Sequence, residues 1–92
     1  MDNFMKTICK YELAITEDVH CIEMPVGATI LSIDSNPPMM WVMVDPDARK
    51  EPRWFHAFAI GQLIPDTISL AFVGSMSAMS DSLTLHVFEE YR

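Results

Sequence analysis

The sequence predicts an all-β protein, either a small sandwich or a partly open barrel of about seven short strands. Three observations carry this prediction. Apolar residues recur mostly at every second position, which is the period of a strand. Residues that favour turns interrupt the chain at short and regular intervals. No segment shows the 3.6-residue apolar period of an amphipathic helix. A chain of 92 residues is one domain's worth, so we expect a single domain over residues 1–92.

Four strands are expected in the first half of the chain. The first two are separated by polar residues 16–18 and are expected to pair as a hairpin. The second ends at Pro25 and Gly27, because Pro lacks a donor for the ladder and Gly permits positive φ. The fourth strand is apolar on both faces, so we expect it at the centre of a sheet. The expected ranges are Thr7–Ile15, His20–Met24, Thr29–Ile33 and Met39–Val44.

Three more strands are expected in the second half, between two loops. Residues 45–52 are charged and contain two prolines, so they are expected to form a loop. Residues 74–81 are small and polar apart from two methionines, and a loop is expected there as well. The expected strands are Arg53–Ile60, Thr67–Val73 and Leu83–Glu90.

The composition excludes several classes of protein. The 13 acidic and 6 basic residues give a net charge of -7, which argues against binding the phosphate backbone of nucleic acid. No apolar run approaches the roughly 18 residues of a membrane helix. The N-terminus lacks the basic-then-apolar order of a signal peptide, so we expect a protein of the cytoplasm. There, Cys9 and Cys21 are expected as buried, reduced thiols; a disulfide would require their strands to pair.

The apolar content is high for so short a chain. Half of the residues are apolar and eight are methionine. A chain of this length buries only roughly two-thirds of its unfolded surface, so we expect a homo-oligomer with an apolar interface, most simply of two-fold symmetry. The alternative is that the methionines fill irregular gaps in the core.

No catalytic or metal-binding motif is present. The three histidines, His20, His56 and His86, are scattered over separate strands, so we expect individually placed rings, at the surface or hydrogen-bonded, and no metal site. Asp45 and Asp47 flank a proline, an arrangement more typical of a turn than of a cation site. No nucleophile elbow and no Gly-rich phosphate loop occurs. We therefore expect a protein that is not an enzyme and that needs no cofactor.

One short segment combines basic and aromatic side chains. Arg49, Lys50 and Arg53 lie within five positions, and Trp54 and His56 follow them. Guanidinium groups can fork onto phosphate and an indole can stack on a base, so these five residues are the candidate ligand-binding site for an anion. On a strand, Arg53 and Trp54 would point to opposite faces, whereas Trp54, His56 and Phe58 would share one.

Two further expectations concern this candidate site. Replacing Arg53 by Ala should weaken binding by roughly 1.5–3 kcal/mol and should leave folding nearly unchanged, as for an exposed loop charge. The alternative is a solvated loop whose cations are balanced by nearby carboxylates.

A separate negative face could compete for a basic surface. Its expected members are Glu12, Glu17, Asp18, Glu23, Glu89 and Glu90.

Four motifs resemble those of a family of small phage and prophage proteins. They are Lys10-Tyr11-Glu12-Leu13, the segment from Ile22 to Ser32, Trp41-Val42-Met43-Val44-Asp45-Pro46 and His86-Val87-Phe88-Glu89. Members of that family commonly begin at the position of Met5, so the resemblance implies that residues 1–4 are an extension. Members often carry Gly-rich hairpins after the fifth strand, where this chain has Gly61-Gln62-Leu63-Ile64. The family brings no catalytic residue with it.

The resemblance implies a phage accessory protein acting in the host cytoplasm, and analogy with other small acidic phage proteins implies counter-defence. The first hypothesis is an oligomer that sequesters a nucleotide-type immune signal through the basic and aromatic segment. The second is an anti-CRISPR-like inhibitor whose acidic surface blocks the basic nucleic-acid-binding site of a host defence protein. An enzyme that degrades a signal is disfavoured by the absence of motifs, and a structural virion component is the remaining alternative.

Overall fold

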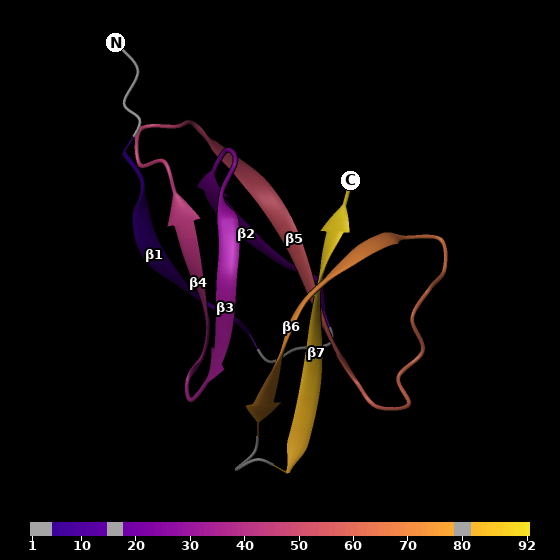
Figure 1. Cartoon of the computed structure of the whole chain (residues 1–92). Coiled ribbons are helices and arrows are strands. Elements are labelled where there is room, and N and C mark those ends of the chain that lie inside the picture. Colours follow the sequence, from indigo (N-terminus) through magenta and orange to yellow (C-terminus); the bar gives the residue numbers. More distant parts are fainter. Residues whose placement is uncertain (1–4, 15–17, 79–81) are drawn as a thin grey trace.

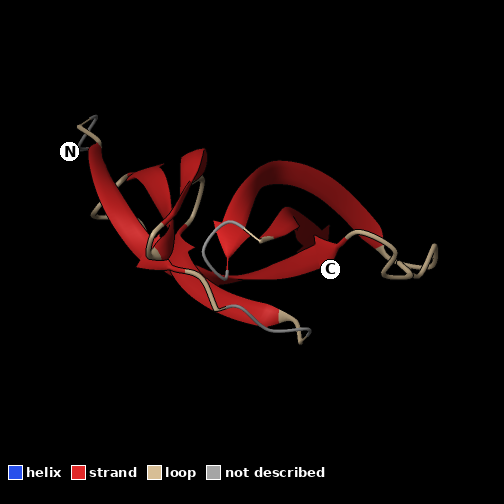
Figure 2. Cartoon of the chain, turned by 90° about the horizontal axis from the view of Figure 1, so that it is seen from below, coloured by secondary structure: helices blue, strands red, loops and turns tan. Residues whose placement is uncertain are grey.

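Strands are the only regular elements in the part of the chain that the structure, a computed structural model, describes: residues 5–14, 18–78 and 82–92. This confirms the expected fold class (Figure 2). The bounds are β1 Thr7–Glu12, β2 His20–Pro25, β3 Thr29–Ser35, β4 Pro38–Val44, β5 Lys50–Ala59, β6 Ser69–Ala78 and β7 Leu83–Tyr91. These described residues contain no helix long and apolar enough to cross a bilayer.

The strands form two antiparallel sheets that pack as a sandwich, one of the two architectures expected. The three-stranded sheet has the order β1-β4-β3, and the four-stranded sheet has the order β2-β5-β7-β6 (Figure 1). The apolar strand β4 lies at the centre of its sheet, as the sequence predicted. Its buried face, with Met40 and Val42 fully inaccessible, packs in a core shared by both sheets.

The expected hairpin between the first two strands is wrong. Thr7 lies opposite Val44 of β4, whereas His20 lies opposite Phe55 of β5. The connection from β1 to β2 therefore joins two sheets. Residues 15–17, which include the expected end of the first strand and part of the expected turn, lie outside the described residues.

The same topology separates the two cysteines. Cys9 lies on β1 and Cys21 on β2, in different sheets, and both are free thiols. Cys9 is half-buried against the core, but Cys21 is exposed, so the prediction of two buried thiols is wrong for Cys21. The reason is alternation, since Ile22 and Met24 occupy the buried face of β2.

The expected loops at 45–52 and 74–81 are each partly strand. β5 begins at Lys50, and β6 continues to Ala78, while residues 79–81 lie outside the described residues. Small side chains suit β6 here because β3 passes close by: a Cβ on Gly74 would lie 3.3 Å from Ile33 Cδ1. Met76 and Ala78 are buried between the sheets. The small residues of this segment therefore mark close packing.

Methionine contributes directly to the core. Met24 and Met40 are fully buried and Met76 is 2% exposed, so gap-filling accounts for these three. Met5 is 76% exposed at the start of the described chain. The remaining core residues come from both sheets, which fixes how the two layers face each other.

Candidate functional site

The predicted ligand-binding residues lie along β5, and its alternation divides them between two faces of the four-stranded sheet. Phe55 belongs to the core, so Arg53 shares its inward face, while Trp54 and His56 lie on the outward face. This confirms that Arg53 and Trp54 point to opposite sides. The five predicted residues are consequently not brought together at one surface.

Arg53 is committed to partners within the molecule. Its Nε and Nη2 donate to the two carboxylate oxygens of Glu89 on β7, at 2.6 and 2.7 Å, and its Nη1 donates to the carbonyl oxygen of Ala28 at 2.6 Å. The side chain of Arg53 is 18% exposed and that of Glu89 is 8% exposed. The hydrogen bonds that the guanidinium donates to Glu89 raise its pKa further above the ordinary range.

The ion pair joins β5 to β7 within the four-stranded sheet, and the bond from Arg53 to Ala28 fastens this sheet to the segment that leads into β3. Each of the three guanidinium nitrogens of Arg53 has an acceptor, so three of its five N–H groups are used, and a phosphate could form a forked pair of bonds with it only by displacing Glu89 or Ala28. The expectation of an exposed loop cation at Arg53 is wrong, because the residue lies within β5 and is largely covered. Its replacement is therefore expected to change folding substantially.

A second set of charges lies on the outward face. His56 Nε2 and Glu90 Oε1 are 2.5 Å apart, and Arg92 Nε donates to Glu90 Oε2 at 2.8 Å. The Arg92 guanidinium carbon lies 4.0 Å from the centroid of the Trp54 ring, a cation–π contact. Hydrogen bonds from Arg92 and then from His56 hold the pKa of Glu90 below its ordinary value.

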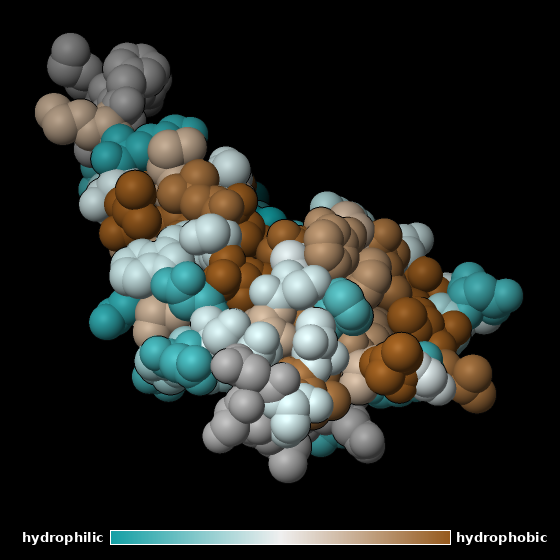
Figure 3. Space-filling view, turned by 60° about the horizontal axis from the view of Figure 1, so that its bottom comes forward, coloured by the Kyte–Doolittle hydropathy of each residue, from teal (hydrophilic) through white to brown (hydrophobic). Residues whose placement is uncertain are grey.

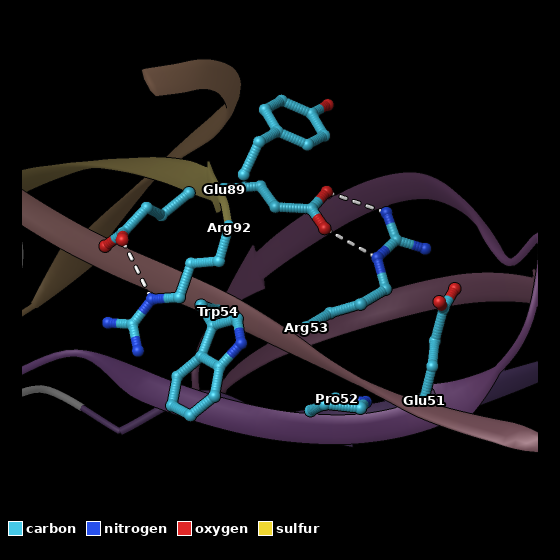
Figure 4. A pocket seen from close by; sticks show the side chains of 8 residues that line it. Glu51, Pro52, Arg53, Trp54, Glu89 and Arg92 are labelled. Atoms are coloured by element: carbon cyan, nitrogen blue, oxygen red, sulfur yellow. Dashed lines mark hydrogen bonds and ion pairs between the residues drawn. The ribbon is translucent and has the colours of Figure 1, made fainter. Parts of the chain in front are cut away.

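Between these two sets of charges lies an open hollow of about 610 Å³ (Figure 4). Its charged lining comprises three carboxylates and two guanidinium groups, each guanidinium already paired with a carboxylate. Tyr91 is 61% exposed at its edge. The complete lining is Glu51, Pro52, Arg53, Trp54, Glu89, Glu90, Tyr91 and Arg92. The hollow is thus aromatic with an excess of negative charge, the opposite of the anion site predicted from the sequence.

Arg49 comes directly before β5 and Lys50 is its first residue, and both are exposed. Neither residue lines the hollow. Nearby, Asp45 Oδ1 accepts a hydrogen bond from the backbone N–H of Asp47 at 3.0 Å, which confirms the turn-forming role predicted for these aspartates. The structure therefore leaves two of the five predicted residues as solvent-facing cations.

The histidines are individually hydrogen-bonded, as predicted. The ring of His20 accepts from the backbone N–H of Ala14 at 3.3 Å, and His86 Nδ1 lies 2.8 Å from Ser75 Oγ. Among residues 5–14, 18–78 and 82–92, no three His, Cys, Asp or Glu side chains are grouped as a metal ion would require.

The predicted negative face does not form as one surface. Glu89 is buried on the inward face, and Glu12 and Glu23 are exposed on strands of different sheets. Glu17 lies outside the described residues. Only Glu90 contributes to the hollow from the outward side, and the inward-facing carboxylates join it there.

Sequence reasoning missed an aromatic cluster on the outward face of the four-stranded sheet. Phe58 stacks with His56 at 5.5 Å between ring centroids and meets Phe88 edge-on at 5.8 Å. Phe72 meets Phe88 edge-on at 5.5 Å and lies 6.5 Å from His86. Each strand carries its members at alternate positions, so the signal existed, but only the pairing of β5, β6 and β7 unites them.

Comparison with known proteins gives a family. Residues 5–92 match the family described as "Domain of unknown function (DUF7352)", and the chain belongs to it. No curated protein and no solved structure matches the chain.

Proposed function

We propose that this protein acts without catalysis, as a binding protein whose Trp54 hollow accepts an arginine or lysine side chain from a partner protein. One observation carries the proposal: the hollow already holds a guanidinium over an indole, that of Arg92 over Trp54 at 4.0 Å. A partner's cation would find the same aromatic ring together with more carboxylates than guanidinium groups. Displacing Arg92 would also free Glu90 for the incoming group.

The charge of the whole molecule supports a basic partner. A net charge of -7 attracts a positively charged surface and speeds association with it. A host defence protein whose basic groups hold nucleic acid would present such a surface. The phage-accessory role implied by the sequence resemblance is compatible with this partner, and the proposal thus follows the second of the sequence-based hypotheses.

Sequestration of a nucleotide-type signal is the second candidate. It is favoured by the exposure of Arg49 and Lys50, two cations close to Trp54 in the chain. Arg53 would have to leave Glu89 and Ala28 before it could join them around a phosphate. Breaking that part-buried pair opposes binding, so this candidate ranks below the first.

Calorimetric titration with a nona-arginine peptide and, separately, with a panel of cyclic dinucleotides discriminates the two candidates. The proposal predicts binding of the peptide and an affinity about fivefold weaker in Trp54→Leu, since an exposed cation–π contact is worth about 1 kcal/mol. Trp41→Phe is the matched control, because Trp41 lies on the other sheet and should leave affinity unchanged. Dinucleotide binding that is lost in the Arg49→Ser/Lys50→Ser variant would instead support sequestration.

A further inference from the structure

The outward face of the four-stranded sheet is apolar over a continuous set of three strands. Phe72 is 62% exposed there, beside the half-buried Phe88 and the exposed His86. The connection from β5 to β6 continues the apolar surface, with Ile60 94% and Leu63 91% exposed. In Figure 3 hydrophobic residues (brown) lie towards the right, the side on which this connection lies in Figure 1, as well as towards the upper left.

We infer that this aromatic face, comprising Phe72, His86 and Phe88 with Ile60 and Leu63, is the interface at which a second copy of the chain docks. The hollow at Trp54 lies at the opposite end of β5 from Ile60 and stays accessible in this arrangement. The inference goes beyond the proposed function, because it concerns a different partner and a neighbouring part of the same sheet face.

The shape of the molecule argues for a missing covering layer. Its radius of gyration is 14.1 Å, whereas a compact domain of this length has roughly 12 Å. Its accessible surface is 6172 Å², against roughly 5,400 Å² for a monomeric protein of this mass. The difference is similar to the roughly 800 Å² that each partner contributes to a standard stable interface. A second copy would therefore supply about the burial that the isolated chain lacks.

Charge restricts where a second copy can dock. Two chains of charge -7 repel each other, so they can meet only where that charge is absent. Along the outward face of β5 and β7, the carboxylate of Glu90 is already matched by His56 and Arg92. Phe72 and Phe88 carry no charge and offer ring edges and faces to identical rings across a two-fold axis, while Phe58 is 7% exposed and supports Phe88 from within the chain.

Sedimentation velocity under reducing conditions tests the inference, since a reductant prevents cross-linking through the exposed Cys21. The wild type should sediment as a dimer, at twice the 10.5 kDa of the chain, at micromolar concentration. Phe72→Glu should raise the dimer dissociation constant at least about 30-fold, the loss expected for a central interface residue. Ile8→Glu is the matched control, because Ile8 is 59% exposed on the other sheet and should leave the dimer intact.

Leu63→Ser gives a second test that does not touch a strand, since Leu63 lies in a connection. It should also weaken the dimer, and circular dichroism should show both variants folded. A wild type that sediments as a monomer would overturn the inference. So would a dimer that survives Phe72→Glu and Leu63→Ser, or one that dissociates with Ile8→Glu alone.

Discussion

The two faces of the β5–β7 strand pair use the same kinds of residue for different purposes. Glu89 faces inward, is 8% exposed and binds Arg53 through both oxygens. Glu90, the next residue, faces outward and binds His56 and Arg92 beside an open hollow. In a strand, the face that a carboxylate occupies decides whether it holds the fold together or remains available to a partner.

The largest expected effect is on the inward pair. Glu89→Ala leaves the Arg53 guanidinium largely covered and without its carboxylate, so it should lower the free energy of unfolding by about 3 kcal/mol. Urea unfolding followed by circular dichroism measures this loss. Glu23→Ala, at an exposed position on β2, is the control and should change stability by at most about 0.5 kcal/mol. A loss below about 1 kcal/mol for Glu89→Ala would mean that the pair behaves as a surface salt bridge.

Removing both members of that pair sharpens the same point. Arg53→Met with Glu89→Leu replaces the two charges by apolar side chains of similar size, so no buried charge is left alone. The double variant should recover most of the stability lost in Glu89→Ala, with the two changes strongly non-additive in a mutant cycle. Additive losses in the same urea experiment would contradict a direct coupling of Arg53 and Glu89.

The outward carboxylate should matter less for folding and more for binding. Glu90→Gln keeps the size of the side chain but removes the charge that Arg92 and His56 share, so the thermal midpoint should fall by less than in Glu89→Ala. The same variant should weaken binding of the nona-arginine peptide. Equal or greater loss of stability in Glu90→Gln than in Glu89→Ala would reverse the division between the faces.

The smallest effect is a pH dependence. In the folded protein the pKa of Glu90 lies below its ordinary value of 4.5, chiefly because Arg92 donates to it. A carboxyl whose folded pKa is depressed stabilises the fold above its unfolded pKa, and this contribution is lost as pH falls through the folded pKa. The difference in thermal midpoint between wild type and Glu90→Gln should therefore have its full size above pH 4.5 and should disappear at lower pH. A difference that persists unchanged in acid would contradict the pairing.

The sequence predicted strands well because alternation is local. The opposite directions of Arg53 and Trp54 followed from period two, and the central place of β4 followed from its apolar residues on both faces. Pairing could not be predicted in the same way, since β1 binds β4 and not the strand that follows it. The segment predicted as a loop at 74–81 contains a strand alternation, with Ser75 exposed and Met76 buried. The close approach of β3 explains this alternation, which the local sequence does not reveal.

The candidate site shows the same limit. The basic and aromatic residues were visible, but their acidic partners lie 34 and 36 positions further along the chain. Glu89 and Glu90 enter the site because β7 pairs with β5 in one particular register, with Phe55 opposite Glu89. No local spacing encodes that register. The basic residues of the site could therefore be found from the sequence, but the carboxylates that neutralise them could not.

The proposed function requires that the hollow at Trp54 recognises a cation and not an anion. The two tryptophan indole N–H signals in a ¹⁵N-correlated NMR spectrum provide the decisive test. Trp41 Nε1 donates to Asp34 at 2.7 Å on the other sheet and serves as the internal reference. On titration with nona-arginine, the account predicts that the Trp54 signal shifts and the Trp41 signal stays, and that cyclic dinucleotides move neither. A Trp54 signal that follows a dinucleotide and ignores the peptide would contradict the account.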